Sequence, residues 1–268
     1  MSTPLLICRE GEVLILSNNN VAARNALSPE FYEALTRALA QAAQDPTVGA
    51  IILTGEGGHF CAGGDLRQLA KRRDLPLQAR REKLEGLHDL IRAVRACPKP
   101  VIAAVEGAAA GAGLSLALAC DMLVAAKNSV FSVAYVKVGL TPDGGATAFL
   151  AEFVSRQVLM QLCLTGERIS GERMAQMGAV NALAEPGQAI VHAVALAQQV
   201  AQGPLQAMAR IKTLCSQAHH NHLAEQLELE AQHMVQAQGS DEAREGINAF
   251  LEKRSPRFRH AAAVVLAQ

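Results

Sequence analysis

The chain has 268 residues, half of them hydrophobic, and its 25 Lys and Arg residues balance 25 Asp and Glu. This length predicts one sizeable α/β domain with an appended element. The balanced charge lacks the basic excess typical of nucleic-acid and anionic-membrane binders, so we expect neither partner. Six scattered cysteines without a C-x-x-C pair, and an N-terminus without a signal-peptide pattern, favour a cytoplasmic protein with reduced thiols.

The first half of the chain predicts strands that alternate with helices. Residues 5–8 and 13–16 flank a short turn and predict a β-hairpin. Ser28-Pro29-Glu30 predicts the start of a helix that runs to about residue 43. The alternation that follows favours an α/β layered core. Apolar runs predict buried strands at 48–54, 101–105 and 122–126, and helices are expected at 77–96 and 114–119.

Residues 101–120 are apolar enough to resemble a membrane span, with Glu106 as their single charge. Glycines interrupt this stretch, and most of its apolarity comes from alanine. We therefore expect a buried strand, a turn and a helix here, and no membrane association.

After about Gly203 the pattern becomes purely helical. Pro204 begins one helix, an acidic amphipathic segment follows at about 224–238, and a last helix is expected at 241–253. We therefore divide the chain into a core, residues 1–202, and a C-terminal helical subdomain, residues 203–268. These helices look too separate from the α/β pattern to be buried by one subunit, which favours an oligomer.

Two glycine-rich loops, residues 57–66 and 107–113, each follow a predicted buried strand and lead into a helical stretch. Small residues let a ligand approach the backbone, and two such loops can form an oxyanion hole with two amide donors. Taken alone, either loop would more often be plain packing, and neither has the spacing of a dinucleotide-binding or P-loop motif. Ser115 follows the second loop without the glycine that a nucleophile elbow needs, so we expect a helix residue there.

The two loops belong to a set of segments that resembles the signature of the crotonase (enoyl-CoA hydratase/isomerase) family in order and spacing. The resemblance covers nearly the whole chain. The segments are 25–27 (Asn-Ala-Leu), 60–66, 100–113 with the following Cys120-Asp121, 138–145 and 250–254.

This resemblance implies an α/β fold built as a spiral of ββα turns, with a C-terminal helical trimerisation subdomain and usually a dimer of trimers. It implies an acyl-CoA substrate whose thioester oxygen is held by two backbone amides while an enolate develops. By position these amides belong to Gly64 and Ala112, and alanine donates an amide as well as the glycine that is common there. Coenzyme A is then part of the substrate, and no separate cofactor or metal is expected.

The resemblance also places other residues around the CoA thioester. Two of them, Phe250 and Lys253, match positions that reach the CoA of a neighbouring subunit. The others are Arg24, Ala26, Ala62, Gly63, Asp65, Leu66, Gly111, Tyr135 and Pro142.

Hydratases of this family add water with two glutamates, and this sequence has neither. Ser115 and Tyr135 stand at the two positions. A tyrosine, with a reference pKa of about 10, is a poor general base near neutral pH. Ordinary two-glutamate hydration is therefore not expected.

One carboxylate, Asp143, remains at a position that matters in the family. Residues 137–145 resemble a subgroup of isomerases that move double bonds in enoyl-CoAs or rearrange ring-epoxide CoAs, and in that subgroup this aspartate shuttles the proton. The plainer interpretation is that Pro142-Asp143-Gly144 forms an ordinary turn in which the aspartate caps a helix. The residues alone favour the turn, whereas the family resemblance favours catalysis.

Other polar residues have weaker patterns. The His59-x-Cys61 pair and the histidines within 219–222 do not complete a metal-ligand set with recognised spacing. Glu106, at the end of a predicted strand, is expected to have a structural hydrogen-bonding role, and Asp121 to stabilise a turn.

Three functions follow from these observations. The leading one is an enoyl-CoA isomerase in which Asp143 moves the proton and the Gly64 and Ala112 amides hold the enolate. A second is an enoyl-CoA hydratase or a hydrolase of ring-derived (oxepin-type) CoA esters, with Asp143 activating water. The third is a CoA-binding oligomer that has lost catalysis.

Overall fold

The computed structural model describes residues 3–259 and contains two sheets, one with strand order β1-β2-β3-β4-β6-β9 and one with order β5-β7-β8. The strands are β1 (Leu5–Glu10), β2 (Val13–Asn18), β3 (Ala50–Gly55), β4 (Val101–Val105), β5 (Ala108–Ala110), β6 (Met122–Ala126), β7 (Val130–Ser132), β8 (Ile169–Ser170) and β9 (Ala182–Ala184). The helices are α1 (Pro29–Gln44), α2 (Leu66–Arg72), α3 (Leu77–Ala96), α4 (Ala112–Ala119), α5 (Ala146–Ala151), α6 (Arg156–Thr165), α7 (Gly171–Gln176), α8 (Ala189–Ala201), α9 (Leu205–Gln217), α10 (Leu223–Gln238) and α11 (Asp241–Leu251), with short 3₁₀ turns η1 (Val21–Ala23), η2 (Glu56–Gly58) and η3 (Ala134–Val138).

The chain winds so that successive turns place one strand in each sheet. β4 and β6 pair in parallel in the larger sheet, and the strands that follow them, β5 and β7, pair in parallel in the smaller one. A helix follows each pair of strands, α4 after β5 and α5 after β7. The only antiparallel pair in the larger sheet, within the described residues, is the predicted N-terminal hairpin β1–β2.

Helix α1 forms where its N-terminal signal predicts it. The Ser28 hydroxyl accepts a hydrogen bond from the Phe31 amide at 3.3 Å, and Pro29 occupies the first helical position, where its missing amide costs nothing. Phe31 and Leu35 are buried on the inner face of the helix. The helix therefore packs one apolar stripe on the core, as its sequence pattern requires.

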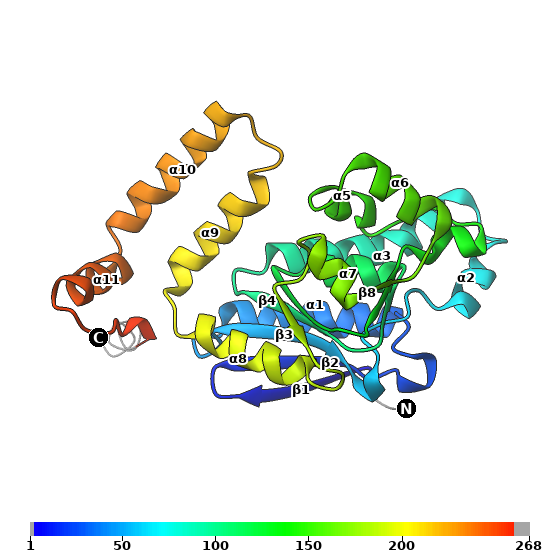
Figure 1. The fold of residues 1–268 in the computed structure, drawn as a ribbon, viewed down its shortest axis with the longest axis horizontal. Coiled ribbons are helices and arrows are strands. Elements are labelled where there is room, and N and C mark those ends of the chain that lie inside the picture. Colours follow the sequence, from blue (N-terminus) through cyan, green and yellow to red (C-terminus); the bar gives the residue numbers. More distant parts are fainter. Residues whose placement is uncertain (1–2, 260–268) are drawn as a thin grey trace.

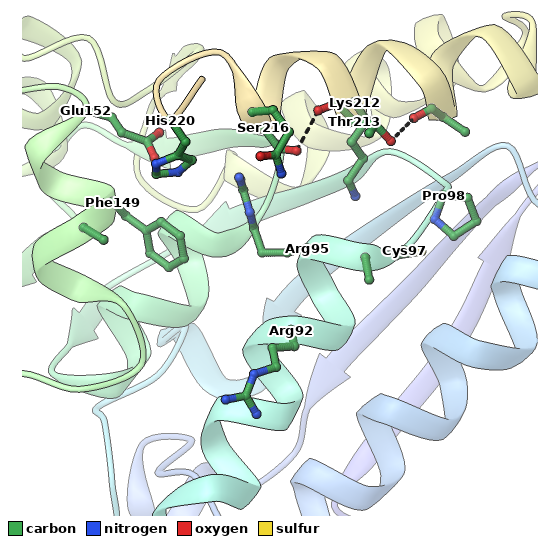
Figure 2. A pocket seen from close by; sticks show the side chains of 14 residues that line it. Arg92, Arg95, Cys97, Pro98, Phe149, Glu152, Lys212, Thr213, Ser216 and His220 are labelled. Atoms are coloured by element: carbon green, nitrogen blue, oxygen red, sulfur yellow. Dashed lines mark hydrogen bonds between the residues drawn. The ribbon is translucent and has the colours of Figure 1, made fainter. Parts of the chain in front are cut away.

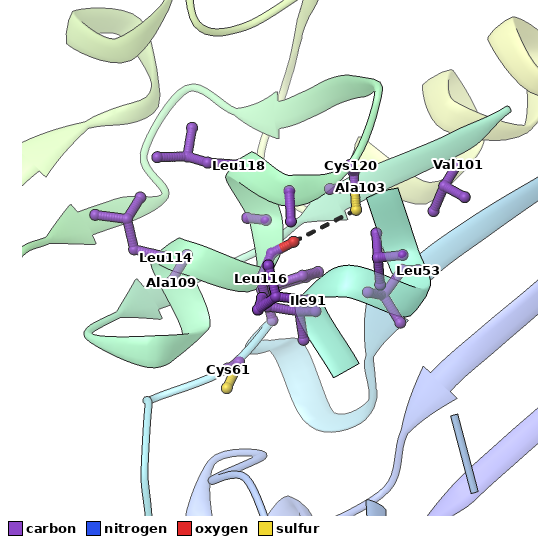
Figure 3. Packing of buried hydrophobic residues seen from close by; sticks show 14 of the residues in the cluster. Leu53, Cys61, Ile91, Val101, Ala103, Ala109, Leu114, Leu116, Leu118 and Cys120 are labelled. Carbon is purple, nitrogen blue, oxygen red and sulfur yellow. Dashed lines mark hydrogen bonds between the residues drawn. The ribbon is translucent and has the colours of Figure 1, made fainter. Parts of the chain in front are cut away.

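The apolar stretch 101–120 is the centre of the molecule. It forms β4, β5 and α4, and every residue of α4 is buried. Figure 3 shows Leu114 and Leu116 of this helix packed among residues of the neighbouring strands and of α3. No helix within residues 3–259 combines the length and the apolarity needed to cross a membrane.

Helix α8 covers the opposite face of the larger sheet (Figure 1). Its alanines, such as Ala193 and Ala197, pack against Ile52, Ile102 and Val124 in a second buried cluster. Small side chains on the helix allow its backbone to approach the sheet closely. The sheet is therefore buried on both faces, which explains its continuous apolar strands.

The C-terminal helices α9 and α10 extend away from the layered core (Figure 1). In the three helices α9, α10 and α11 only Ala249 is buried, so this region has little apolar core of its own. An ion pair between Lys212 of α9 and Asp121, the residue just before β6, joins α9 to the core with its charged atoms 2.7 Å apart. Asp121 also accepts a hydrogen bond from the Val101 amide at 2.8 Å, so it does more than stabilise a turn. All six cysteines are free thiols.

Candidate active site

The two glycine loops lie side by side because the middle of the first pairs with β5 in parallel. The Cys61 amide donates to the Ala108 carbonyl at 2.8 Å, and the Ala110 amide donates to the Cys61 carbonyl at 3.0 Å. One residue earlier, the Phe60 amide donates to the Glu106 carbonyl at 2.9 Å. These backbone bonds fix the two loops against each other without help from side chains.

Glycine is required where the loops touch. A Cβ atom on Gly113 would lie 2.4 Å from the carbonyl oxygen of Cys61. A Cβ atom on Gly63, whose φ is +103°, would lie 2.7 Å from the Ala110 oxygen and 3.7 Å from the Ala112 nitrogen. Only the absence of these Cβ atoms lets the backbones approach so closely, and this approach brings the 63–64 peptide to the start of α4.

The predicted amide donors, Gly64 and Ala112, are both available. Ala112 is the first residue of α4, so its N–H has no intrahelical acceptor. Among residues 3–259, no backbone carbonyl accepts a hydrogen bond from either amide. Two unpaired N–H groups on converging loops, one of them at a helix N-terminus, suit an oxygen atom that gains negative charge.

Ser115, one helical turn after Ala112, belongs to a compact group that also contains Tyr135 and Asp143. Ser115 of α4 is fully buried, and its hydroxyl donates to the backbone carbonyl of Asp143 at 2.9 Å. The Tyr135 hydroxyl of η3 donates to Oδ1 of the Asp143 carboxylate at 2.7 Å. The structure thus brings together the two residues that replace the family glutamates and the carboxylate that the sequence singled out.

Burial controls the protonation of this group. It raises the pKa of Asp143 above the usual value, and the hydrogen bond from Tyr135 partly opposes this rise, as do the charges of His88 and Arg72. Burial also raises the pKa of Tyr135, and the nearby Asp143 carboxylate raises it further. Tyr135 is therefore a protonated donor near neutral pH and no base, while Asp143 is a carboxylate with increased basicity.

Several of the residues expected around CoA lie in the first loop or beside it. Arg24 is exposed in the left-handed conformation, with φ +50°, and its carbonyl accepts a hydrogen bond from the Ala62 amide at 3.0 Å. Asp65 uses its carboxylate to cap α2 through the Arg67 amide at 2.8 Å. Leu66 is 57% exposed beside this cap. Their contacts with CoA stay predictions.

Asn25 has a role that sequence reasoning did not assign. It is fully buried with φ +59°, and its side-chain oxygen accepts from the Asn20 amide at 3.0 Å. Its side-chain nitrogen donates to the carbonyls of Glu56 at 2.8 Å and His59 at 2.6 Å. One amide side chain thus ties the Arg24 turn to the first glycine loop. The signal was available, since asparagine is the residue that tolerates this backbone conformation and bonds to nearby backbone.

The two residues expected to serve a neighbouring subunit are not brought to these loops within one chain. Phe250, at the end of α11, is 84% exposed, and Lys253 follows it with φ +54°. Figure 1 shows α11 and α2 at opposite ends of the molecule. A contribution of either residue to this site would therefore come from another copy of the chain.

Other polar residues singled out in the sequence have structural partners. Glu106 accepts a hydrogen bond from the Ala189 amide at 2.8 Å, at the first residue of α8, which confirms its structural role. His59 accepts from the Ala108 amide through Nδ1 at 3.2 Å. In the part of the chain that the structure describes, no group of three or more His, Cys, Asp or Glu side chains is arranged to hold a metal ion.

A cavity of about 510 Å³ lies between the end of α3, α5 and α9, and none of the predicted site residues lines it. Figure 2 shows Arg95 reaching between Phe149 and Ser216, and its guanidinium lies 5.6 Å from the centre of the Phe149 ring. Lys212, which pairs with Asp121, lines the same cavity. The cavity therefore belongs to the joint between the core and α9, away from the candidate site.

An α/β core with paired strands in two sheets, two unpaired amides on converging loops and a half-buried carboxylate form an arrangement that suits an enzyme class in which an anionic oxygen is stabilised during proton transfer. Residues 9–261 match the family model for enoyl-CoA hydratase/isomerase. The chain therefore belongs to the enoyl-CoA hydratase/isomerase (crotonase) family, and the expected crotonase-like fold is confirmed.

Known relatives include both chemistries. The chain is 36% identical over 250 residues to the 1,2-epoxyphenylacetyl-CoA isomerase of Escherichia coli (strain K12), covering 93% of this chain and 95% of that protein. It is 32% identical over 255 residues to the 2,3-dehydroadipyl-CoA hydratase of the same organism, covering 95% and 98%. The crystal structure of an enoyl-CoA hydratase from Polaromonas sp. JS666 matches with a TM-score of 0.92 and 45% identity, covering 94% of this chain and 98% of that one.

Proposed function

We propose that this protein is an acyl-CoA isomerase in which Asp143 removes the proton alpha to the thioester and returns it further along the acyl chain. The thioester oxygen lies between the amides of Gly64 and Ala112 while the enolate forms. The double bond moves without gain or loss of atoms, and coenzyme A takes part only as the carrier of the acyl group. The other residues predicted around CoA contact the CoA thioester, and a neighbouring subunit contributes Phe250 and Lys253.

The observation that carries the proposal is the position of the Asp143 carboxylate. Its Oδ1 accepts a hydrogen bond from Tyr135, and the backbone carbonyl of the same residue accepts one from Ser115. Tyr135 and Ser115 stand at the two glutamate positions of the family's hydratases. Neither hydroxyl is a base near neutral pH, because both keep their protons. Burial raises the pKa of Tyr135, and a serine hydroxyl does not ionise in this range. Asp143 is thus the group here that can accept a proton and give it back, and its raised pKa brings it closer to the working pH of a general base.

The backbone donors supply the other half of the chemistry. A proton alpha to a thioester is a weak acid, and a base such as Asp143 removes it only if the enolate oxygen is stabilised at the same time. Two preorganised N–H groups perform this task in other oxyanion holes, where losing one donor costs about 10²–10³ in rate. The two unpaired amides support the same role for Gly64 and Ala112.

A second function is favoured by the names of several relatives, which are hydratases. In that function the Asp143 carboxylate activates a water molecule that adds to an enoyl-CoA or opens a ring-derived CoA ester. The two functions use the same hole and differ in whether oxygen from water enters the product.

The assembly that we propose is a trimer or a dimer of trimers. Helices α9 to α11 expose large apolar side chains that a soluble monomer would leave in water, and exposed patches of this kind commonly mark subunit interfaces. These side chains are Ile211, Leu223, Leu227, Met234, Val235, Ile247, Phe250 and Leu251.

The Asp143→Asn variant tests the isomerase proposal, because it keeps the shape of the side chain and removes its basicity. Purified protein is incubated in deuterium oxide with 2-enoyl, 3-enoyl and ring-derived CoA thioesters, and products are identified by mass spectrometry and NMR. We expect CoA affinity close to wild type, isomerisation reduced about 10²-fold or more, and loss of deuterium exchange at the alpha carbon.

Three results would contradict the isomerase proposal. Incorporation of oxygen from labelled water by the wild-type protein would favour the hydratase or hydrolase function. Wild-type isomerisation and exchange in Asp143→Asn would reduce Asp143 to a turn residue. Tight binding of acyl-CoA by the wild-type protein without turnover of any thioester would favour a binding protein that has lost catalysis.

A further inference from the structure

The hydroxyl groups of Ser115 and Tyr135 supply only two protons, and both are directed at Asp143. The Ser115 proton goes to the Asp143 backbone carbonyl, 2.9 Å away. The Tyr135 proton goes to Oδ1 of the Asp143 carboxylate, 2.7 Å away. The two hydroxyl oxygens are 3.3 Å from each other, so the three residues form one closed group. One residue thus receives a bond on its backbone and another on its side chain.

Packing leaves this group little freedom. Gly144 has φ +59°, and a Cβ atom there would lie 3.0 Å from the Ser115 Cβ, so the backbone after Asp143 rests directly on α4. The Tyr135 ring lies against Gly111, whose hypothetical Cβ would be 3.8 Å from the ring. Both hydroxyl-bearing residues are buried, and a buried hydroxyl that loses its acceptor has no water to replace it. The arrangement is therefore held at the backbone and at the side chains.

The two oxygens of the Asp143 carboxylate consequently differ. Oδ1 accepts the Tyr135 proton, whereas Oδ2 accepts no hydrogen bond from any group in residues 3–259. A carboxylate held by one oxygen presents the other in a defined direction. For proton transfer this matters, because the accepting oxygen has to lie within hydrogen-bond reach of the proton that it removes.

We infer that Tyr135 is a positioning residue for the proton transfer proposed above: its hydroxyl holds Oδ1 of Asp143, which leaves Oδ2 as the atom that takes and returns the proton. Ser115 supports it by fixing the backbone carbonyl of Asp143. This inference rests on the proposed isomerase function and adds to it. At the two positions where the family's hydratases have bases, this chain has hydroxyl donors that serve a third residue.

The hydroxyls of Tyr135 and Ser115 should differ in their effect on the pKa of Asp143. The Tyr135 bond reaches the carboxylate itself and lowers its pKa, opposing the effect of burial. The Ser115 bond reaches only the backbone. Removing Tyr135's hydroxyl therefore shifts the titration of Asp143 upward, whereas removing Ser115's hydroxyl leaves that titration in place. The charged or titratable side chains that also act on this region are Arg72 of α2, His88 of α3 and Tyr32 of α1.

The experiment compares Tyr135→Phe, Ser115→Ala and, as a matched loss of a phenol hydroxyl that is not bonded to Asp143, Tyr32→Phe. The pH profile of kcat/KM is measured with the best thioester substrate from the panel. For Tyr135→Phe we expect kcat about 10-fold to 100-fold lower, in line with the loss of a hydrogen bond to a charged group, and an acid limb moved to higher pH. For Ser115→Ala we expect a smaller loss of kcat with the acid limb unmoved, and for Tyr32→Phe an unmoved acid limb.

A second measurement does not depend on turnover. The Asp143 carboxylate is observed by NMR in protein labelled with ¹³C-aspartate and assigned by its absence in Asp143→Asn. Its titration midpoint should rise in Tyr135→Phe and stay in place in Ser115→Ala. Thermal unfolding shows whether each variant is folded, and the NMR titration remains interpretable in a folded variant that is inactive.

The outcomes separate this inference from the function on which it rests. If Asp143→Asn is inactive while Tyr135→Phe keeps the wild-type rate and midpoint, Asp143 is the base but Tyr135 does not position it. Equal upward shifts in Tyr135→Phe and Tyr32→Phe would show a general effect of the pocket, and would also overturn the inference. If Asp143→Asn is fully active, the isomerase proposal itself fails.

Discussion

At the scale of single residues, Asp143 has a cost in stability that follows from its surroundings. Burial raises its pKa, so the folded protein holds this proton to higher pH than the unfolded chain does. The folded state is then favoured below the ordinary pKa of about 3.8 for aspartate, and this advantage is lost as the pH rises through the raised value. Near neutral pH the ionised Asp143 side chain therefore lowers the free energy of unfolding.

The Asp143→Asn variant should accordingly be more stable than the wild type near neutral pH. Each unit of pKa elevation corresponds to about 1.4 kcal/mol, and partial exposure of the side chain keeps the gain below that full conversion. The difference in unfolding free energy should widen from pH 4 upward and then become constant. Urea unfolding at several pH values measures it. A variant that is less stable than wild type at pH 8 would contradict the prediction.

The sequence located the residues of this site but not their bonds. Asp143, Ser115 and Tyr135 were named from motif positions, and the structure places them in contact. That Tyr135 acts as a donor to Asp143 depends on the packing of η3 against α4, which no local pattern encodes. For Asn25 the signal was local, yet two of its three side-chain partners, the carbonyls of Glu56 and His59, lie 31 and 34 residues away in the sequence.

At the scale of elements, α4 combines a structural role with the chemical role that we propose for its first amide. Its first residue, Ala112, sits where proline is well tolerated in a helix, because the amide there has no intrahelical acceptor. Gly111 before it has φ +52° and ψ −127°, a conformation that glycine can keep next to proline. Ala112→Pro can therefore remove one amide donor with little damage to the helix.

We predict that Ala112→Pro lowers kcat/KM by about 10²–10³, the usual effect of losing one oxyanion donor. Ala112→Gly is the matched control, since it keeps the amide and should retain most of the activity. Circular dichroism and thermal unfolding show whether the proline variant is folded. Unchanged turnover in folded Ala112→Pro would remove Ala112 from the oxyanion hole.

Elements with strong local patterns were predicted well and those made by distant pairing were not. The bounds of β4, β6 and α3 match the expected ranges residue for residue. β3 begins two residues later than expected, and Gly49 just before it lies against Ala201 at the end of α8. The short strands β5, β7, β8 and β9 exist only through pairing with other segments. Two or three residues carry no periodic signal of their own.

At the scale of the whole molecule, helices α9 to α11 bury only Ala249 within residues 3–259, so most of their apolar surface still needs a partner. They are predicted to find it in other copies, and light scattering at micromolar concentration should give a mass that is a multiple of three subunits. Phe250→Asp places a charge on a side chain that is 84% exposed in one chain, and it should weaken assembly if that ring is buried between subunits. A wild-type protein that stays monomeric would contradict the predicted assembly and the role of Lys253 at a neighbour's CoA.

The contact between the first loop and α4 contains a cysteine, Cys61, whose reactivity reports local unfolding. The Cys61 thiol is fully buried in that contact, and burial raises its pKa to about 12, so it is almost entirely protonated and unreactive in the closed state. A thiol reagent reaches it only when the loop and the helix separate. The rate at which Cys61 is labelled therefore measures how often this part of the fold opens by local unfolding. Bound acyl-CoA, if held by both loops, would lower the rate at which Cys61 is labelled.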